Sequence, residues 1–158
     1  NNDDMSQWYP NLFSGMPSYG GYIFMNGDPT KTIRNLILFN PGMKVWFYLS
    51  LSVIGMFVLL RLIGVQYLSA LFGSLISGLT PYSFGLINAG HLNKIFAMAY
   101  IPWVLAAIFY LMKKPTLKSI LFLAIASAFH LWANHPQIVY YTWMVIGFYW
   151  VWEIGYSL

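Results

Sequence analysis

Five long apolar runs fill the chain after residue 42 and limit the folds that are open to it. Each run comes close to the roughly 20 residues that a helix needs to cross the hydrocarbon core of a bilayer. None has the alternation of apolar and polar residues that a transmembrane barrel strand requires, and helices satisfy their own backbone groups in lipid. We therefore predict an all-α, polytopic integral membrane bundle with helices at about 43–63, 65–84, 95–112, 119–133 and 137–156.

The composition agrees with this prediction. The 158 residues are 59% hydrophobic and 20% aromatic, and only 8% are charged, against about 25% in soluble domains. The net charge of +4 comes from scattered basic residues and one short lysine cluster, without the basic stripe that nucleic-acid binding needs. Nucleic acid is therefore not an expected partner. The absence of cysteine removes disulfides and thiolate metal sites.

Prolines and small residues indicate where the expected helices end, bend or pack. Pro102 falls inside the third run, where a missing backbone donor should kink the helix. The segment GSLISG, residues 73–78, offers a small-residue face against which another helix can pack closely. Turns or helix ends are expected at Gly64, Pro81, Pro115 and Pro136, with Pro81 closing the second helix.

Residues 1–42 differ in composition from the remainder. They are rich in Gly, Pro, Asn, Ser and aromatic residues, which suit turns and a membrane–water boundary. We predict an outer-face, periplasmic loop, within which TIRNLILF is a candidate interfacial helix. Because the chain lacks an initiator Met and stops at the end of an apolar run, we interpret it as a fragment of a longer membrane protein.

The basic residues predict an orientation. Lys113, Lys114 and Lys118 share one short hairpin, the densest basic cluster in the chain, so this hairpin is predicted to be cytoplasmic. Alternating crossings then place residues 1–42 and the expected 84–94 loop outside. The outer face collects Asp3, Asp4, Asp28, Arg34, Asn88, His91, Asn93, Lys94, Asn134, His135 and Gln137, whereas the opposite face keeps Arg61, the lysine hairpin and Glu153.

Each polar residue also has a purely structural interpretation. His91 can cap a helix entry, with Asn93 and Lys94 reaching toward lipid headgroups. His130 lies inside the fourth run, where a polar side chain is costly and usually has a partner; it is either a packing histidine or a ligand. The convergence of the polar residues on one face, rather than any single residue, favours a functional site.

Three segments resemble signatures of a known family. SQWYPNLFSGMPSYGG (6–21), NAGHLNKIFAMAYIPWVLA (88–106) and ANHPQIVYY (133–141) are similar to successive motifs of the YfhO-like bacterial membrane proteins, which in turn resemble the GT-C glycosyltransferases. The resemblance implies a multi-pass protein of the bacterial cytoplasmic membrane that transfers a sugar from a polyprenyl-phosphate carrier to an outer-face acceptor. It also implies an acidic residue in the first outer loop as general base or metal ligand.

Under this resemblance the outer-face residues take specific roles. Asp4, with Asp3 as the alternative, is the candidate base that accepts a proton from the acceptor hydroxyl. Positive and hydrogen-bonding groups are expected around the departing phosphate, and Asn93 and Gln137 are candidates for positioning phosphate or sugar hydroxyls. A divalent metal would need further oxygen ligands. The candidate phosphate-binding residues are His91, Lys94, His135 and Arg34.

Two alternatives remain open. The chain can be a non-catalytic scaffold subunit of a larger membrane complex that contacts lipid, other subunits or a pigment. In that case His91, His130 or His135 is a candidate axial ligand to a tetrapyrrole. The other alternative is a transporter or flippase, for which broken helices are the usual sign; the sequence predicts only Pro102 as a mid-helix interruption.

Overall fold

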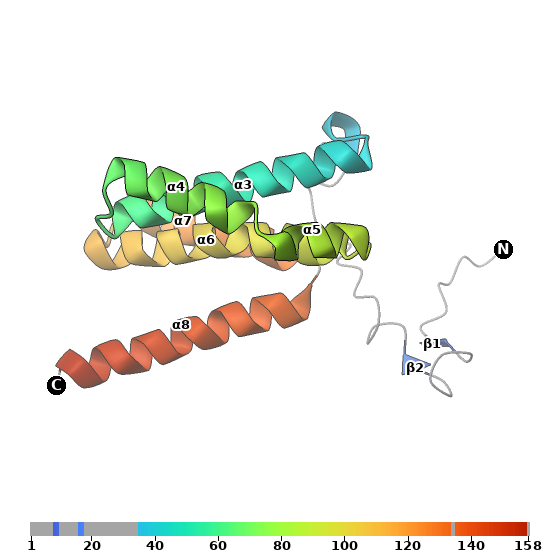
Figure 1. Ribbon diagram of the computed structural model, residues 1–158. Helices are drawn as coiled ribbons and strands as arrows, with labels where there is room; N and C mark the ends of the chain where they lie inside the picture. Colours follow the sequence, from blue (N-terminus) through green and yellow to red (C-terminus); the bar gives the residue numbers. More distant parts are fainter. Residues whose placement is uncertain (1–7, 10–15, 18–34, 134, 158) are drawn as a thin grey trace.

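A computed structural model describes residues 8–9, 16–17, 35–133 and 135–157. Six helices form the body of the described chain (Figure 1). A two-residue antiparallel pair, β1 (Trp8–Tyr9) and β2 (Met16–Pro17), precedes them. The helices are α3 (Pro41–Leu62), α4 (Tyr67–Gly78), α5 (Pro81–Asn88), α6 (Leu92–Lys113), α7 (Leu117–Trp132) and α8 (Pro136–Ser157). The predicted all-α class is confirmed.

Three helical spans in the described residues are long and apolar enough to cross a membrane. They are α3, α6, and α4 together with α5. The apolar α7 is shorter, at 16 residues, and α8 has 22 residues with many aromatic side chains. Large apolar side chains are widely exposed, among them Phe39, Ile76 and Trp152. This exposed apolar surface is compatible with a membrane protein.

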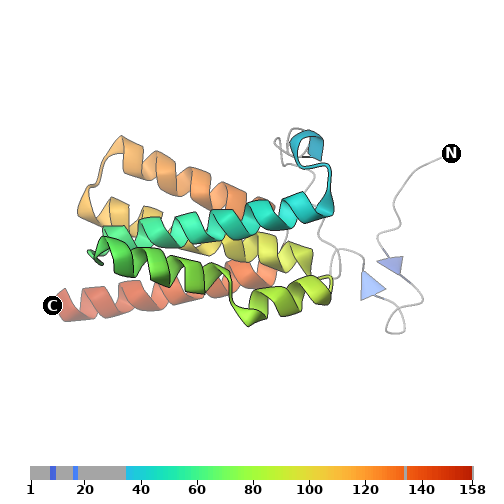
Figure 2. The same ribbon diagram turned by 45° about the horizontal axis from the view of Figure 1, so that its top comes forward.

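The second predicted helix is broken, and its end differs from the prediction. Pro81 does not close a helix; it opens α5, which continues to Asn88 through much of the expected 84–94 loop. Proline suits this first helical position because the missing N–H would have no partner there. Thr80 caps α5 by accepting a hydrogen bond from the Ser83 N–H at 3.4 Å. Figure 2 shows the change of direction between α4 and α5.

Helix α6 lies at the centre of the bundle. Half of its apolar window is buried, and it packs against α3 and α7, with lighter contacts to α5 and α8. Alanines allow this close packing: Ala97, Ala106 and Ala107 are fully buried. On the α3 side, the rings of Tyr48 and Phe96 stack with centroids 4.1 Å apart. In Figure 1, α8 lies along the outside of the bundle.

A glycine sets the contact between α3 and α6. The Trp103 Nε1–H donates a hydrogen bond to the Leu51 carbonyl at 2.9 Å. This indole lies against Gly55, where an added Cβ would be only 2.5 Å from Trp103 Nε1. The small-residue segment of α4 packs similarly on α3, because a Cβ at Gly78 would lie 2.3 Å from Val53 Cγ2. Small residues therefore determine both contacts of α3.

Candidate functional site

The link between α5 and α6 brings the first candidate residues to one end of the bundle. Gly90 adopts a left-handed conformation with φ +74°. Its N–H donates to the Ile87 carbonyl at 3.0 Å, and the His91 N–H donates to the Leu86 carbonyl at 2.9 Å. These two bonds form the Schellman motif that ends a helix. The exposed His91 is thereby held immediately before α6, although its side chain makes no capping bond.

Lys94 lies in the first turn of α6, and the expected 84–94 loop therefore ends earlier than predicted. A cation in this turn is disfavoured by the positive end of the helix dipole. The Lys94 Nζ lies 5.5 Å from the centroid of the Tyr82 ring on α5, a cation–π contact that offsets part of this cost. The half-buried ammonium and the helix N-terminus together make this end of α6 a region of positive potential.

His135 joins this region from the link between α7 and α8. Its side chain is half-buried, and its Nδ1 has no hydrogen-bond partner among the described residues. Burial lowers the pKa of His135 below its ordinary value of 6.5; a backbone hydrogen bond partly opposes this effect, and the nearby positive charges of Lys94 and His91 add to it. Lys94 and His91 are therefore close enough to His135 to act on it electrostatically. We call His91, Lys94 and His135 the cationic cluster.

The lowered pKa of His135 predicts a pH dependence of stability. Between the lowered value and the unfolded value of about 6.5, the unfolded chain binds more protons, so the free energy of unfolding rises with pH. The free energy of unfolding should therefore be highest above about pH 6.5. It should decrease as the pH drops toward the lowered pKa of His135. His135→Gln should reduce the loss of melting temperature between pH 7.5 and pH 5 in detergent.

The exposed His91 provides the matched control for this measurement. His91→Gln should keep most of the wild-type pH dependence, because the charge of the exposed His91 is the smallest of the causes that act on the pKa of His135. An undiminished dependence in His135→Gln would contradict the assignment of the effect to burial of this imidazole.

The basic side chains at the opposite end of the bundle donate hydrogen bonds to backbone carbonyls. Arg61 Nη1 donates to the Val65 carbonyl at 2.8 Å, and Lys113 Nζ donates to the Leu62 carbonyl at the end of α3. Both bond carbonyls at or just beyond a helix C-terminus, a common position for basic side chains. These two cations therefore stabilise helix ends, whereas Lys94 at the other end contacts the Tyr82 ring and has no carbonyl or carboxylate partner among the described residues.

The other predicted residues have separate environments. Asn93 is exposed in the first turn of α6, and Gln137 is exposed on α8, where its Nε2 donates to the Tyr141 hydroxyl at 3.0 Å. Asn88 is the exposed last residue of α5. Figure 1 shows the α5–α6 and α7–α8 links at the same end of the bundle. Asp3, Asp4, Asp28, Arg34 and Asn134 lie outside the described residues.

His130 is enclosed within the bundle. Its side chain is 0% exposed, and neither ring nitrogen has a hydrogen-bond partner among the described residues. The hydroxyl of Ser127, three residues earlier on the same face of α7, is also without a partner there. An axial ligand must present an open nitrogen to the metal of a tetrapyrrole. The enclosed ring of His130 does not do so in this packing, whereas His91 is exposed.

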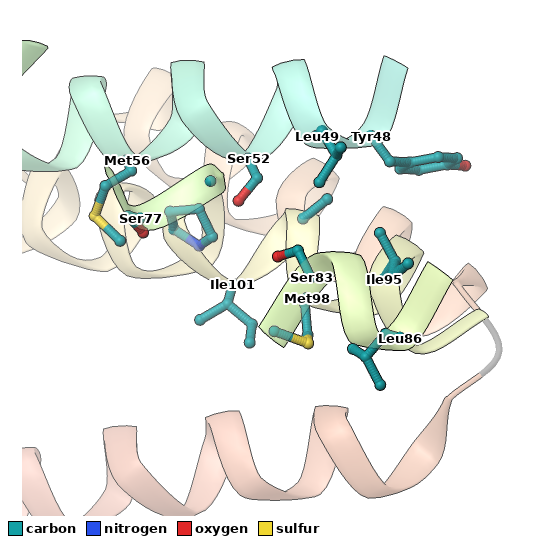
Figure 3. A pocket seen from close by; sticks show the side chains of 13 residues that line it. Tyr48, Leu49, Ser52, Met56, Ser77, Ser83, Leu86, Ile95, Met98 and Ile101 are labelled. Atoms are coloured by element: carbon teal, nitrogen blue, oxygen red, sulfur yellow. The ribbon is translucent and has the colours of Figure 1, made fainter. Parts of the chain in front are cut away.

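Sequence reasoning missed a cavity at the break between α4 and α5. It has a volume of about 160 Å³ and is lined from α3, α4, α5 and α6. Its polar lining comes from Ser52, Ser77 and Ser83, and Figure 3 shows their hydroxyls together with the labelled apolar residues around them. The one available signal was the pair of prolines, Pro81 and Pro102, in two neighbouring apolar runs. We call this the broken-helix cavity.

An apolar groove lies between α3, α6 and α7. Its volume is about 340 Å³, and its lining is almost entirely hydrocarbon and aromatic. Trp103 lies in the groove, with its Nε1–H already bonded to the Leu51 carbonyl. The groove is lined by Phe47, Leu51, Tyr100, Trp103, Phe122, Ile125, Ala126 and Phe129.

In the described ranges, no three His, Asp or Glu side chains come together as a metal site. Asp3 and Asp4, the candidate catalytic bases, lie outside those ranges. No protein-family model matches the chain, and comparisons with curated proteins and with solved structures found no significant match.

Proposed function

We propose that this chain is part of a YfhO-like, GT-C-like membrane glycosyltransferase that takes a sugar from a polyprenyl-phosphate carrier in the bacterial cytoplasmic membrane. The cationic cluster is the observation that carries the proposal. Lys94 and His91 act electrostatically on His135, at an end of the bundle where apolar helices meet polar links. In the proposed orientation, this end and residues 1–42 face the periplasm and the Lys113–Lys118 hairpin faces the cytoplasm.

The cluster suits a phosphate group chemically. Lys94 supplies a fixed positive charge, and the unpartnered Nδ1 of His135 can donate a hydrogen bond once a phosphate draws a proton onto the ring. Charge-assisted hydrogen bonds of this kind are about twice as strong as neutral ones. They would stabilise the negative charge that develops on the departing polyprenyl phosphate. Asn93 and Arg34 are the proposed additional phosphate ligands.

The remaining parts of the reaction follow from the resemblance. Asp4, or Asp3 in its place, takes the proton of the acceptor hydroxyl as that oxygen attacks the anomeric carbon. The bond from the anomeric carbon to the phosphate oxygen breaks, and the polyprenyl phosphate leaves with the electron pair. Gln137 positions sugar hydroxyls in this proposal. The apolar groove is a suitable surface for part of the isoprenoid chain.

The proposal is tested by measuring the binding of a short polyprenyl phosphate to the protein in nanodiscs. Lys94→Ala should weaken binding about 10- to 100-fold, because a hydrogen bond to a charged group contributes about 1.5–3 kcal/mol. Lys114→Ala is the matched control, since Lys114 is an exposed lysine just beyond the other end of α6. Equal affinities in both variants and the wild type would refute the phosphate site.

A transporter or flippase is the second candidate, and one observation favours it. Helix α4–α5 is interrupted at Leu79 and Thr80, beside a cavity that faces Pro102 near the middle of α6. Discontinuous helices near the bilayer midplane are typical of transporter binding sites. Counterflow of labelled sugars or lipid-linked sugars in proteoliposomes would support this candidate, and transfer to an acceptor without counterflow would eliminate it.

A further inference from the structure

We infer that the broken-helix cavity binds an uncharged, hydroxylated group of the size of a single sugar unit. The inference deepens the proposed function, on which it rests, by giving the sugar of the carrier a place separate from its phosphate. Its first support is the backbone chemistry that two prolines create.

Two residues that line the cavity have carbonyl groups that a following proline leaves without a helical hydrogen bond. In a continuous helix, the N–H at position 81 would bond to the carbonyl of Ser77, and that at position 102 would bond to Met98. Proline has no N–H, so both carbonyls lose their helical partner. Ser77 and Met98 both line the cavity. Among apolar helices, an unsatisfied carbonyl is costly, so this site favours a polar occupant.

Serine hydroxyls provide the complementary groups. Ser83 is buried, and its Oγ lies 3.1 Å from Thr80 Oγ1. No hydrogen bond within the described residues engages the hydroxyl of Ser52 or Ser77, and both residues line the cavity from α3 and α4. In Figure 3, Ser52 and Ser83 approach the cavity from opposite sides. A hydroxyl both donates and accepts, so the lining offers acceptors and donors within one small volume.

The uncharged lining and the small volume of the broken-helix cavity limit the kind of ligand that it can hold. None of the lining residues is acidic or basic, so the cavity has no counter-charge for an ion, whose burial without a partner is costly. A group with several hydroxyls can donate to the freed carbonyls and accept from the serines. The volume of about 160 Å³ corresponds to about five water molecules at roughly 30 Å³ each. It therefore fits one small group rather than an oligosaccharide.

The cavity and Lys94 lie along the same face of α6. Lys94, Met98 and Ile101 follow one another on a single face of α6, at helical spacings of four and three residues. Met98 and Ile101 line the cavity, and Lys94 lies one turn above them beside Tyr82. The residue after Tyr82 is Ser83, which also lines the cavity. A phosphate at Lys94 would therefore place an attached sugar at the cavity.

The absence of cysteine makes a direct test available. Ser83→Cys and Ser52→Cys are near-isosteric and place a single thiol in the cavity of the full-length protein. A small neutral maleimide should label both thiols in nanodiscs. Simple methyl glycosides should slow this labelling, about tenfold at ten times the dissociation constant. Ser69→Cys, on the exposed face of α4, should show no protection, and gel filtration checks that each variant is folded.

Each result of the labelling experiment either supports or overturns the binding of a sugar-sized group in the cavity. Labelling that no glycoside slows means that the cavity holds water only, and it overturns the inference. A thiol in folded protein that cannot be labelled means that the cavity is closed, and it also overturns the inference. Protection by glycosides supports it even if polyprenyl phosphate fails to bind, in which case the proposed glycosyltransferase function alone is rejected. Protection by bare polyprenyl phosphate as strong as by its sugar-bearing form would assign the cavity to the carrier.

Discussion

Gly55→Ala is expected to lower the stability of the bundle by about 1–3 kcal/mol, the usual cost of overpacking a tight contact. The new methyl group would lie 2.5 Å from Trp103 Nε1, and the indole cannot retreat without losing its bond to the Leu51 carbonyl. Thermal unfolding in detergent, followed by tryptophan fluorescence, should show a melting temperature lower by several degrees.

A second glycine gives the control for this measurement. Gly147 in α8 has open space around its missing Cβ, so Gly147→Ala should be neutral or stabilising by up to about 1 kcal/mol, the helical advantage of alanine. Adding Trp103→Phe to Gly55→Ala should recover part of the loss, because the smaller ring vacates the space. Equal stability of the Gly55→Ala and Gly147→Ala proteins would contradict the packing argument.

The double replacement of Asp3 and Asp4 by Asn is expected to reduce sugar transfer at least about 100-fold, the usual contribution of a general base. The prediction depends on the resemblance and on the place of these residues in the first loop of the sequence. Binding of polyprenyl phosphate should be retained, because neither carboxylate is assigned to the phosphate. The assay follows labelled sugar from the carrier into product.

Single variants identify which carboxylate acts. Asp4→Asn should account for most of the loss if Asp4 is the base, with Asp3→Asn close to wild type. Asp28→Asn, another acid of the same predicted loop, serves as the control. Unchanged transfer in the double variant would remove both residues from the proposed mechanism.

Hydrophobic run length was sufficient to predict most of the fold. It identified the positions of α3, α6, α7 and α8 to within a few residues, because apolar length is a strong signal. It did not reveal that α6 is central, since that depends on where Ala97, Ala106 and Ala107 lie relative to the neighbouring helices. Run length carries no information about which helices touch.

The misplaced boundary at Pro81 has a local cause. A proline after an apolar run fits either the end of one helix or the first turn of the next. Thr80, with its side chain available as a cap, and Gly90 as a left-handed terminator were the residues that distinguish the two cases. These signals predict a short helix only when they are considered together, and Pro81 alone does not distinguish the two cases.

The candidate site was predictable in part. Alternating helix direction was enough to group His91, Lys94 and His135 at one end. Side-chain detail, such as the contact of Lys94 with Tyr82, depends on how α5 and α6 pack. The broken-helix cavity was not predictable from spacing, because Ser52, Ser77 and Ser83 come from three helices and share no sequence pattern.

The two links of α5 have a mechanical consequence. Leu79 and Thr80 precede this eight-residue helix, and Gly90 follows it, so α5 is a separate short segment between α4 and α6. Tyr82 and Ser83 are neighbours on this segment, one beside the ammonium of Lys94 and the other in the cavity. Any tilt of α5 would therefore move both residues together, and would change the surroundings of the Lys94 ammonium and the lining of the cavity at the same time.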